Sequence, residues 1–189
     1  MSCDNAGIFV KTDRLILRPV RMDDAPFVQK EFAHWDIIKQ MVASVPWPYP
    51  DDGAVTHLNK CLPEVAAGTM CLALITLHDG TPLGMIHYRT TDEESIWKRG
   101  FWLAIPHQGN GYMTEAATAM NGYMFQHRGA KAILADNFAT NLESRRVKEK
   151  QGFEFLGCFK DAPGHRREEG DTYSDRWILT RKRWEELSA

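Results

Sequence analysis

Two glycines separated by one residue, Gly109 and Gly111, lie between an apolar segment and a helix-forming segment, and this junction constrains the fold most strongly. The apolar residues Phe101–Ile105 predict a β-strand before it, and a long helical run begins near Gly111. Glycine lets the backbone turn sharply and expose its N–H groups. Because N–H groups at a helix N-terminus attract anions, the junction predicts a site for a phosphate-bearing ligand such as a pyrophosphate. A simple tight turn is the alternative interpretation.

Strand-like and helix-like segments alternate along the rest of the chain. Alternating or continuous apolar runs predict strands at residues 14–18, 70–77, 83–88, 96–103, 131–135, 153–159 and 173–180. Apolar residues at helical spacing predict helices at residues 22–43 with a break near His34, at 53–66 capped by Asp51 or Asp52, at 116–125 and at 141–151. This order predicts the α/β class with a mixed sheet.

Length and charge narrow the possibilities further. The 189 residues fit one domain, residues 1–189, with a full core. The formal net charge of -2 predicts no general attraction to nucleic acid or to an anionic membrane. No apolar run approaches the roughly 20 residues that span a bilayer, and the N-terminus lacks a signal-peptide pattern, so a cytoplasmic location is expected. The four cysteines lack metal-like spacing, which predicts buried free thiols and no metal site.

Two sequence blocks resemble the GNAT superfamily of acyl-CoA N-acyltransferases. The first, Gln108–Tyr112, is similar to that family's pyrophosphate loop Q/R-x-x-G-x-G/A, with Met113 where glycine or alanine is usual. The second, Asn141–Gly157, resembles the pattern N-x-x-S-x-x-V-x-E-K-x-G-F-x-x-x-G of the ribosomal-protein-alanine N-acetyltransferase-like branch. The resemblance spans a core of about residues 12–184. Two blocks in the right order disfavour the simple-turn interpretation.

The resemblance implies a single-domain GNAT-like fold with a mixed central sheet of about six to seven strands. It implies helices on both faces and a splay between the fourth and fifth strands, here about residues 101–105 and 131–136. Acetyl-CoA is the implied co-substrate and would lie in that opening. The residues implied to bind it are Trp102, Leu103, Ala104 and Ile105 through their backbone, Gln108, Gly109, Asn110, Gly111, Tyr112, Met113 and Thr114 around the pyrophosphate, and Asn141 and Ser144 near the pantetheine arm. The Met113 side chain either narrows the loop or points into the core.

The resemblance also implies how the chemistry is divided among the residues. Many relatives place a tyrosine at the position of Lys148 to protonate the leaving thiolate. In the branch resembled here a serine takes that role, so Ser144 is the expected catalytic residue, with simple helix packing as the alternative. Asn141 has the alternative role of a helix cap. No single general base stands out, and the candidates are Glu93, Glu94, His87 and Asp161.

An amine acceptor is expected to enter from the face opposite acetyl-CoA. Trp35, Trp47, Tyr49 and residues 161–171 are candidate walls of its pocket. The predicted function is N-acetylation of a primary amine, either a protein N-terminus or a small molecule, by direct attack on the thioester. A non-catalytic acyl-CoA-binding sensor or regulatory module is the alternative. The expected partners include no nucleic acid and no membrane, and the chain is expected to be a monomer or homodimer.

Overall fold

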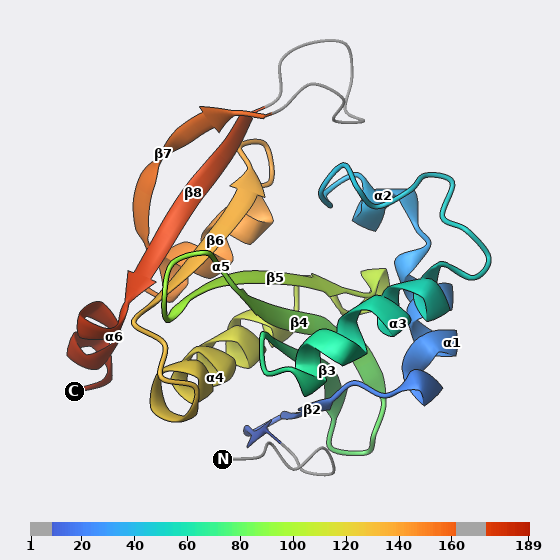
Figure 1. Cartoon of the computed structure of the whole chain (residues 1–189), viewed down its shortest axis with the longest axis horizontal. Helices are drawn as coiled ribbons and strands as arrows, with labels where there is room; N and C mark the ends of the chain where they lie inside the picture. Colours follow the sequence, from blue (N-terminus) through green and yellow to red (C-terminus); the bar gives the residue numbers. More distant parts are fainter. Residues whose placement is uncertain (1–8, 162–172) are drawn as a thin grey trace.

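The computed structural model describes residues 9–161 and 173–189. One mixed sheet has the strand order β1-β2-β3-β4-β5-β6-β8-β7 (Figure 1). Its strands are β1 Val10–Lys11, β2 Leu15–Pro19, β3 Met70–Leu77, β4 Pro82–Thr90, β5 Ile96–Leu103, β6 Ala132–Phe138, β7 Glu154–Lys160 and β8 Tyr173–Thr180. The helices are α1 Ala25–Phe32, α2 Trp35–Ile38, α3 Gly53–Ala66, α4 Tyr112–His127, α5 Leu142–Lys150 and α6 Arg181–Ser188, with 3-10 turns η1 Met22–Asp24 and η2 Ile105–His107.

The α/β class, the mixed sheet and the break near His34 are confirmed, and the number of strands is corrected. The sheet of the described residues has eight strands. The strand that was not predicted is β1, because its two residues are too few to give a periodic pattern. The strand expected at residues 101–105 ends at Leu103, since Ile105 begins η2. The C-terminal helix α6 was not expected. Asp52 does occupy the N-cap of α3, but its carboxylate accepts from the Thr56 hydroxyl and not from a backbone N–H.

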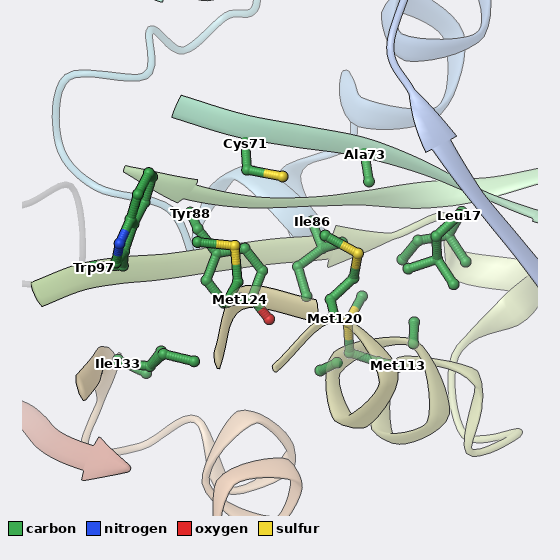
Figure 2. Packing of buried hydrophobic residues seen from close by; sticks show 14 of the residues in the cluster. Leu17, Cys71, Ala73, Ile86, Tyr88, Trp97, Met113, Met120, Met124 and Ile133 are labelled. Carbon is green, nitrogen blue, oxygen red and sulfur yellow. The ribbon is translucent and has the colours of Figure 1, made fainter. Parts of the chain in front are cut away.

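Helices cover both faces of the sheet, as β3 illustrates. Alternate residues of a strand point to opposite faces. Cys71, Ala73 and Ile75 join the core that contains Met120 and Met124 of α4 (Figure 2). The other face of β3 contributes Met70, Leu72 and Leu74 to a second core, which the buried residues of α1 and α3 complete. The sheet is therefore a shared wall between two apolar layers, and its central strands are fixed from both sides.

The splay of the sheet lies between β5 and β6, the only neighbouring strands in the described order that run parallel. They pair from Ile96–Ala132 to Arg99–Ala135 and no further. β5 continues to Leu103 paired with β4, whereas β6 continues to Phe138 paired with β8. Figure 1 shows β6 and β8 turning away from β5. The expected opening is thus present, with β5 and β6 as its two sides.

The thiols follow the expectation in part. Cys61 and Cys71 are buried, but Cys158 is exposed because it lies on β7, where the burial pattern is largely exposed. Cys3 lies outside the described residues. Within the described ranges, no helix combines the length and the apolar character needed to cross a membrane.

Gly84 on β4 should be intolerant of a side chain because β5 approaches it closely. A Cβ at Gly84 would lie 2.2 Å from the Trp102 carbonyl oxygen. Gly84→Ala should therefore lower the free energy of unfolding by about 1–3 kcal/mol in a urea titration. Gly122→Ala on α4 is the matched control, since the nearest atom would be 3.9 Å away. Equal stability of the two variants would contradict this close approach.

Candidate functional site

The loop before α4 has the backbone geometry of an anion site. Gly109 and Gly111 have φ angles of 77° and 76°, in the left-handed region that glycine adopts without strain. Gly111 is the N-cap of α4, and the first helical hydrogen bond runs from Glu115 N–H to Gly111 O at 3.1 Å. The N–H groups of Tyr112, Met113 and Thr114 therefore precede the first helical bond and point out of the helix N-terminus. Three donors and the positive end of the helix dipole converge there.

The loop is braced by Arg14, a residue that the sequence analysis did not assign to the site. Its guanidinium donates to Glu115 Oε2 at 2.6 Å and to Asn110 O at 3.1 Å. It also lies 4.7 Å from the centre of the Tyr112 ring. The side chain of Asn110 donates to Gln108 O at 3.0 Å. These contacts fix the loop in place before any ligand binds.

Two loop side chains point away from a ligand. Met113 is 6% exposed and belongs to the core beneath α4, so it does not narrow the loop (Figure 2). Gln108 Nε2 donates to Leu103 O at 2.9 Å and holds the loop to the end of β5. The backbone, and not these side chains, is what the loop offers to an anion.

The edge of β5 that faces the splay offers fewer groups than expected. Ala104 N–H donates to Leu83 O at 2.8 Å, toward β4. Because backbone groups on a strand alternate in direction, Trp102 also faces β4, and Phe101 and Leu103 face the opening. The expectation that Trp102 and Ala104 offer free backbone groups is therefore corrected. Ile105 lies in η2, beyond the strand edge.

The start of α5 lies on the other side of the opening. Asn141 caps this helix, since its Oδ1 accepts from Ser144 N–H at 3.0 Å. The cap role weighed for Asn141 is thus confirmed. Asn141 and Ser144 both line a large open cleft. The predicted pair is therefore brought to one surface beside the splay.

Lys148 makes a buried contact with Ser144 that the sequence did not reveal. The lysine is 1% exposed, and its Nζ donates to Ser144 Oγ at 2.8 Å, to Asn137 Oδ1 at 2.9 Å and to Ser144 O at 3.3 Å. Its pKa is lowered from 10.5 to about 7, mainly by burial and also by the charge of Arg99, against the opposing charges of Asp136 and Asp175. In the sequence, this contact was indicated only by the spacing of four residues between Ser144 and Lys148, which places both on one face of a helix.

A second buried cation, Arg99 of β5, ties the two sides of the splay together. Its Nη1 donates to Gln151 Oε1 at 2.7 Å and to Asn121 Oδ1 at 3.2 Å. Gln151 Nε2 donates in turn to Thr114 O at 3.3 Å. Arg99 Nε and Nη2 are buried without a hydrogen-bond partner among the described residues. Burial lowers the pKa of this guanidinium, and none of the hydrogen bonds described for it joins it to a carboxylate.

The cleft of about 1200 Å³ extends from the splay to the face covered by α1 and α3. Tyr49 lines it, as do two candidate bases, His87 and Asp161. Burial lowers the pKa of His87 to about 4, so this ring is neutral at neutral pH. The residues of the loop that precedes α4 are not among those that line this cleft, and β5 connects the loop to it.

Four of the other proposed side chains do not reach the cleft. Trp35 and Trp47 pack on each other, with ring centres 5.1 Å apart, and do not line the cleft. Glu93 and Glu94 are exposed in the turn between β4 and β5 and also lie outside the lining. Of the expected wall at residues 161–171, only Asp161 is among the described residues.

Comparison with known proteins gives a consistent result. The family model described as "Acetyltransferase (GNAT) domain" matches residues 14–154. A search of curated proteins finds no match.

Solved structures with the same fold include an acetyltransferase of the GNAT family from Bacillus anthracis, with a TM-score of 0.78 and 21% identity over 92% of this chain and 98% of that one. Mycobacterium smegmatis RimJ in complex with CoA-disulfide has a TM-score of 0.76 and 22% identity over 89% and 82% of the chains. Spermidine N-acetyltransferase from Vibrio cholerae in complex with CoA and spermine has a TM-score of 0.77 and 15% identity over 92% and 99%.

The burial of Lys148 predicts a pH-dependent stability. Its pKa of about 7 in the folded protein lies below the ordinary 10.5, so between these values the unfolded chain binds more protons and the free energy of unfolding rises with pH. At roughly 1.4 kcal/mol per pKa unit, the gain from about pH 7 to 9 should be about 2 kcal/mol in urea titrations. Lys148→Met should lack this gain, and the exposed control Lys150→Met should keep it. An unchanged pH slope in Lys148→Met would contradict the assignment.

Proposed function

Because this chain belongs to the acetyltransferase (GNAT) domain family, we propose that it transfers an acetyl group from acetyl-CoA to a primary amine. The acceptor is a protein N-terminus or a small-molecule amine, and the reaction is direct attack on the thioester. One observation carries the proposal: the edge of β5 left open by the splay leads directly into the anion-binding loop before α4. A ligand with a pyrophosphate at one end and amides along a flexible arm could bind both, its amides to the edge of β5 and its pyrophosphate to the loop.

The donor half of the site works through the backbone. The free N–H and C=O groups of Phe101 and the free N–H of Leu103 would pair with the amides of the pantetheine arm. Unpaired buried amides cost about 1–3 kcal/mol each, so a ligand that pairs them is favoured. The N–H groups of residues 112–114 would bind the pyrophosphate. Asn141 and Ser144 would lie beside the thioester end.

The reaction itself needs a neutral amine, a stabilised oxyanion and a protonated leaving group. A free N–H on the open edge of β5 would donate to the carbonyl oxygen as charge develops there. The Ser144 hydroxyl would donate to the departing thiolate. Holding the two substrates together would supply much of the acceleration. With its pKa of about 4, His87 is a poor general base, and the amine proton would leave to the solvent through water in the cleft.

Two of the carboxylates that line the cleft, Glu64 and Asp136, are already paired with cations. Glu64 is paired with Arg89 at 2.7 Å, and Asp136 with Lys98 at 2.7 Å. Paired carboxylates have little charge left with which to attract a chain of ammonium groups. Since similar structures include both RimJ and a spermidine acetyltransferase, the acceptor is best identified by direct comparison.

The enzymatic proposal predicts turnover. Incubation with acetyl-CoA and a panel of peptides with free N-termini, monoamines and polyamines should release free CoA thiol, faster for at least one amine than with no amine. Ser144→Ala should lower kcat by about 10²-fold or more while CoA affinity stays within a few-fold. CoA binding without amine-dependent thiol release across the panel would favour the sensor or regulatory module instead.

The phosphate loop predicts a separate binding phenotype. Gly111→Val should weaken CoA binding at least about tenfold in calorimetry, because valine is strained at a φ of 76° and would distort the loop. Gly122→Val, inside α4 and away from the loop, controls for general destabilisation. The loop assignment is wrong if Gly111→Val binds CoA with wild-type affinity. Desulfo-CoA tests the phosphate contacts without the thiol.

A further inference from the structure

Lys148 is a buried, nucleophilic and titratable group that the mechanism above does not use. It lies on α5, one turn after Ser144, and its ammonium contacts the Ser144 hydroxyl at 2.8 Å. Both residues line the cleft, but Ser144 is partly exposed whereas Lys148 is 1% exposed. The Ser144 hydroxyl therefore offers a hydrogen-bonded path for a proton from Lys148 to the more exposed side.

We propose that Lys148 supplies the proton for the departing CoA thiolate through the Ser144 hydroxyl, acting as a positioning and proton-relay residue. This inference rests on the acetyltransferase function proposed above. Three donors on Nζ match three acceptors, because Asn137 Oδ1 and Ser144 O take the other two hydrogen bonds at 2.9 and 3.3 Å. The ammonium is thereby held with one proton aimed at Ser144 Oγ. Because the Ser144 oxygen accepts a hydrogen bond from Lys148, its own proton points away from the lysine. The cleft that Ser144 lines is the side on which that proton can be donated.

The step balances without another reactant. The amine nitrogen bonds to the acetyl carbon, the C–S bond breaks, and sulfur keeps the electron pair. Sulfur takes the Ser144 hydroxyl proton as Ser144 takes a proton from Nζ, which leaves a neutral Lys148. The new amide nitrogen releases one proton to water in the cleft, and Lys148 regains one from water. No net proton is consumed.

The surroundings of Lys148 suit a group that gives up a proton near neutral pH. Arg99 of β5 is a second buried cation, and its repulsion favours the neutral lysine. From β6, Asp136 faces it but is engaged by Lys98 and Arg176. From β8, Asp175 is buried and opposes the loss of the proton. Two cations beside the opening would also stabilise sulfur as it becomes negative.

A structural role for Lys148 is the competing explanation, since the same bonds join α5 to β6. The pH dependence of turnover separates the two roles. With an acceptor whose amine is neutral across the range, wild-type kcat should fall above about pH 7 as Lys148 loses its proton, approaching tenfold per pH unit. Lys148→Met should lower kcat by about 10²-fold, keep CoA affinity within a few-fold and lack this falling limb. Lys148→Arg, which stays charged, should restore part of the rate and shift the limb to higher pH.

A measurement on bound CoA tests the relay without turnover. The thiol of CoA, titrated by thiolate absorbance in the complex, should ionise at a pH at least one unit lower when bound to wild type than when free. Lys148→Met should lose this shift, and the exposed control Lys150→Met should retain it. Melting temperatures and CoA affinity show whether each variant is folded.

The outcomes distinguish this inference from the proposed function. Turnover by wild type with an unchanged pH profile in Lys148→Met overturns the relay and leaves the acetyltransferase intact. An unshifted thiol in the wild-type complex also overturns the relay. Absence of turnover with every amine overturns the acetyltransferase and the relay together. A lost limb, a lost thiol shift and partial rescue by arginine support the relay.

Discussion

The divergence of β5 and β6 after the Arg99–Ala135 pair is the constraint on which the rest of the site depends. Inside a sheet each strand satisfies its neighbour's backbone groups, and here β6 turns to β8 while β5 stays with β4. Beyond Arg99, the edge of β5 that faces β6 has no partner strand among the described residues. The same divergence makes room for the start of α5 beside that edge. Ligand binding and helix placement therefore have a single structural origin.

Much of the fold follows from local pattern in the sequence. The ends of α3, β5 and β8 agree with the expected segments at residues 53–66, 96–103 and 173–180, because periodicity and turn residues define them. β1 and α6 were missed, since two residues carry no period and α6 is short and strongly polar. The separation of β5 and β6 is a tertiary property that was expected only from the family resemblance, and the register at which they part comes from the structure.

The candidate site was predictable to the extent that it is built from backbone. Gly109 and Gly111 predict the left-handed backbone that they adopt, and Asn141 predicts the helix N-cap that it forms. The contacts of Lys148 with Asn137, and of Arg99 with Gln151, join residues that are distant in sequence or on different elements. Nothing local marks such pairs. The family pattern even drew attention away from Lys148, because it replaces the residue usual at that position.

Arg14 adds a thermodynamic connection between the chain's N-terminal region and the anion loop. It lies just before β2, yet its guanidinium donates hydrogen bonds to Asn110 and Glu115, about a hundred residues later in the chain. A ligand that binds only the ordered loop must, by mass action, also favour the state in which this clamp is closed. Coenzyme binding at the loop and local opening of β1 and β2 at the edge of the sheet are therefore linked equilibria. Saturation with coenzyme should slow amide hydrogen exchange in β1 and β2.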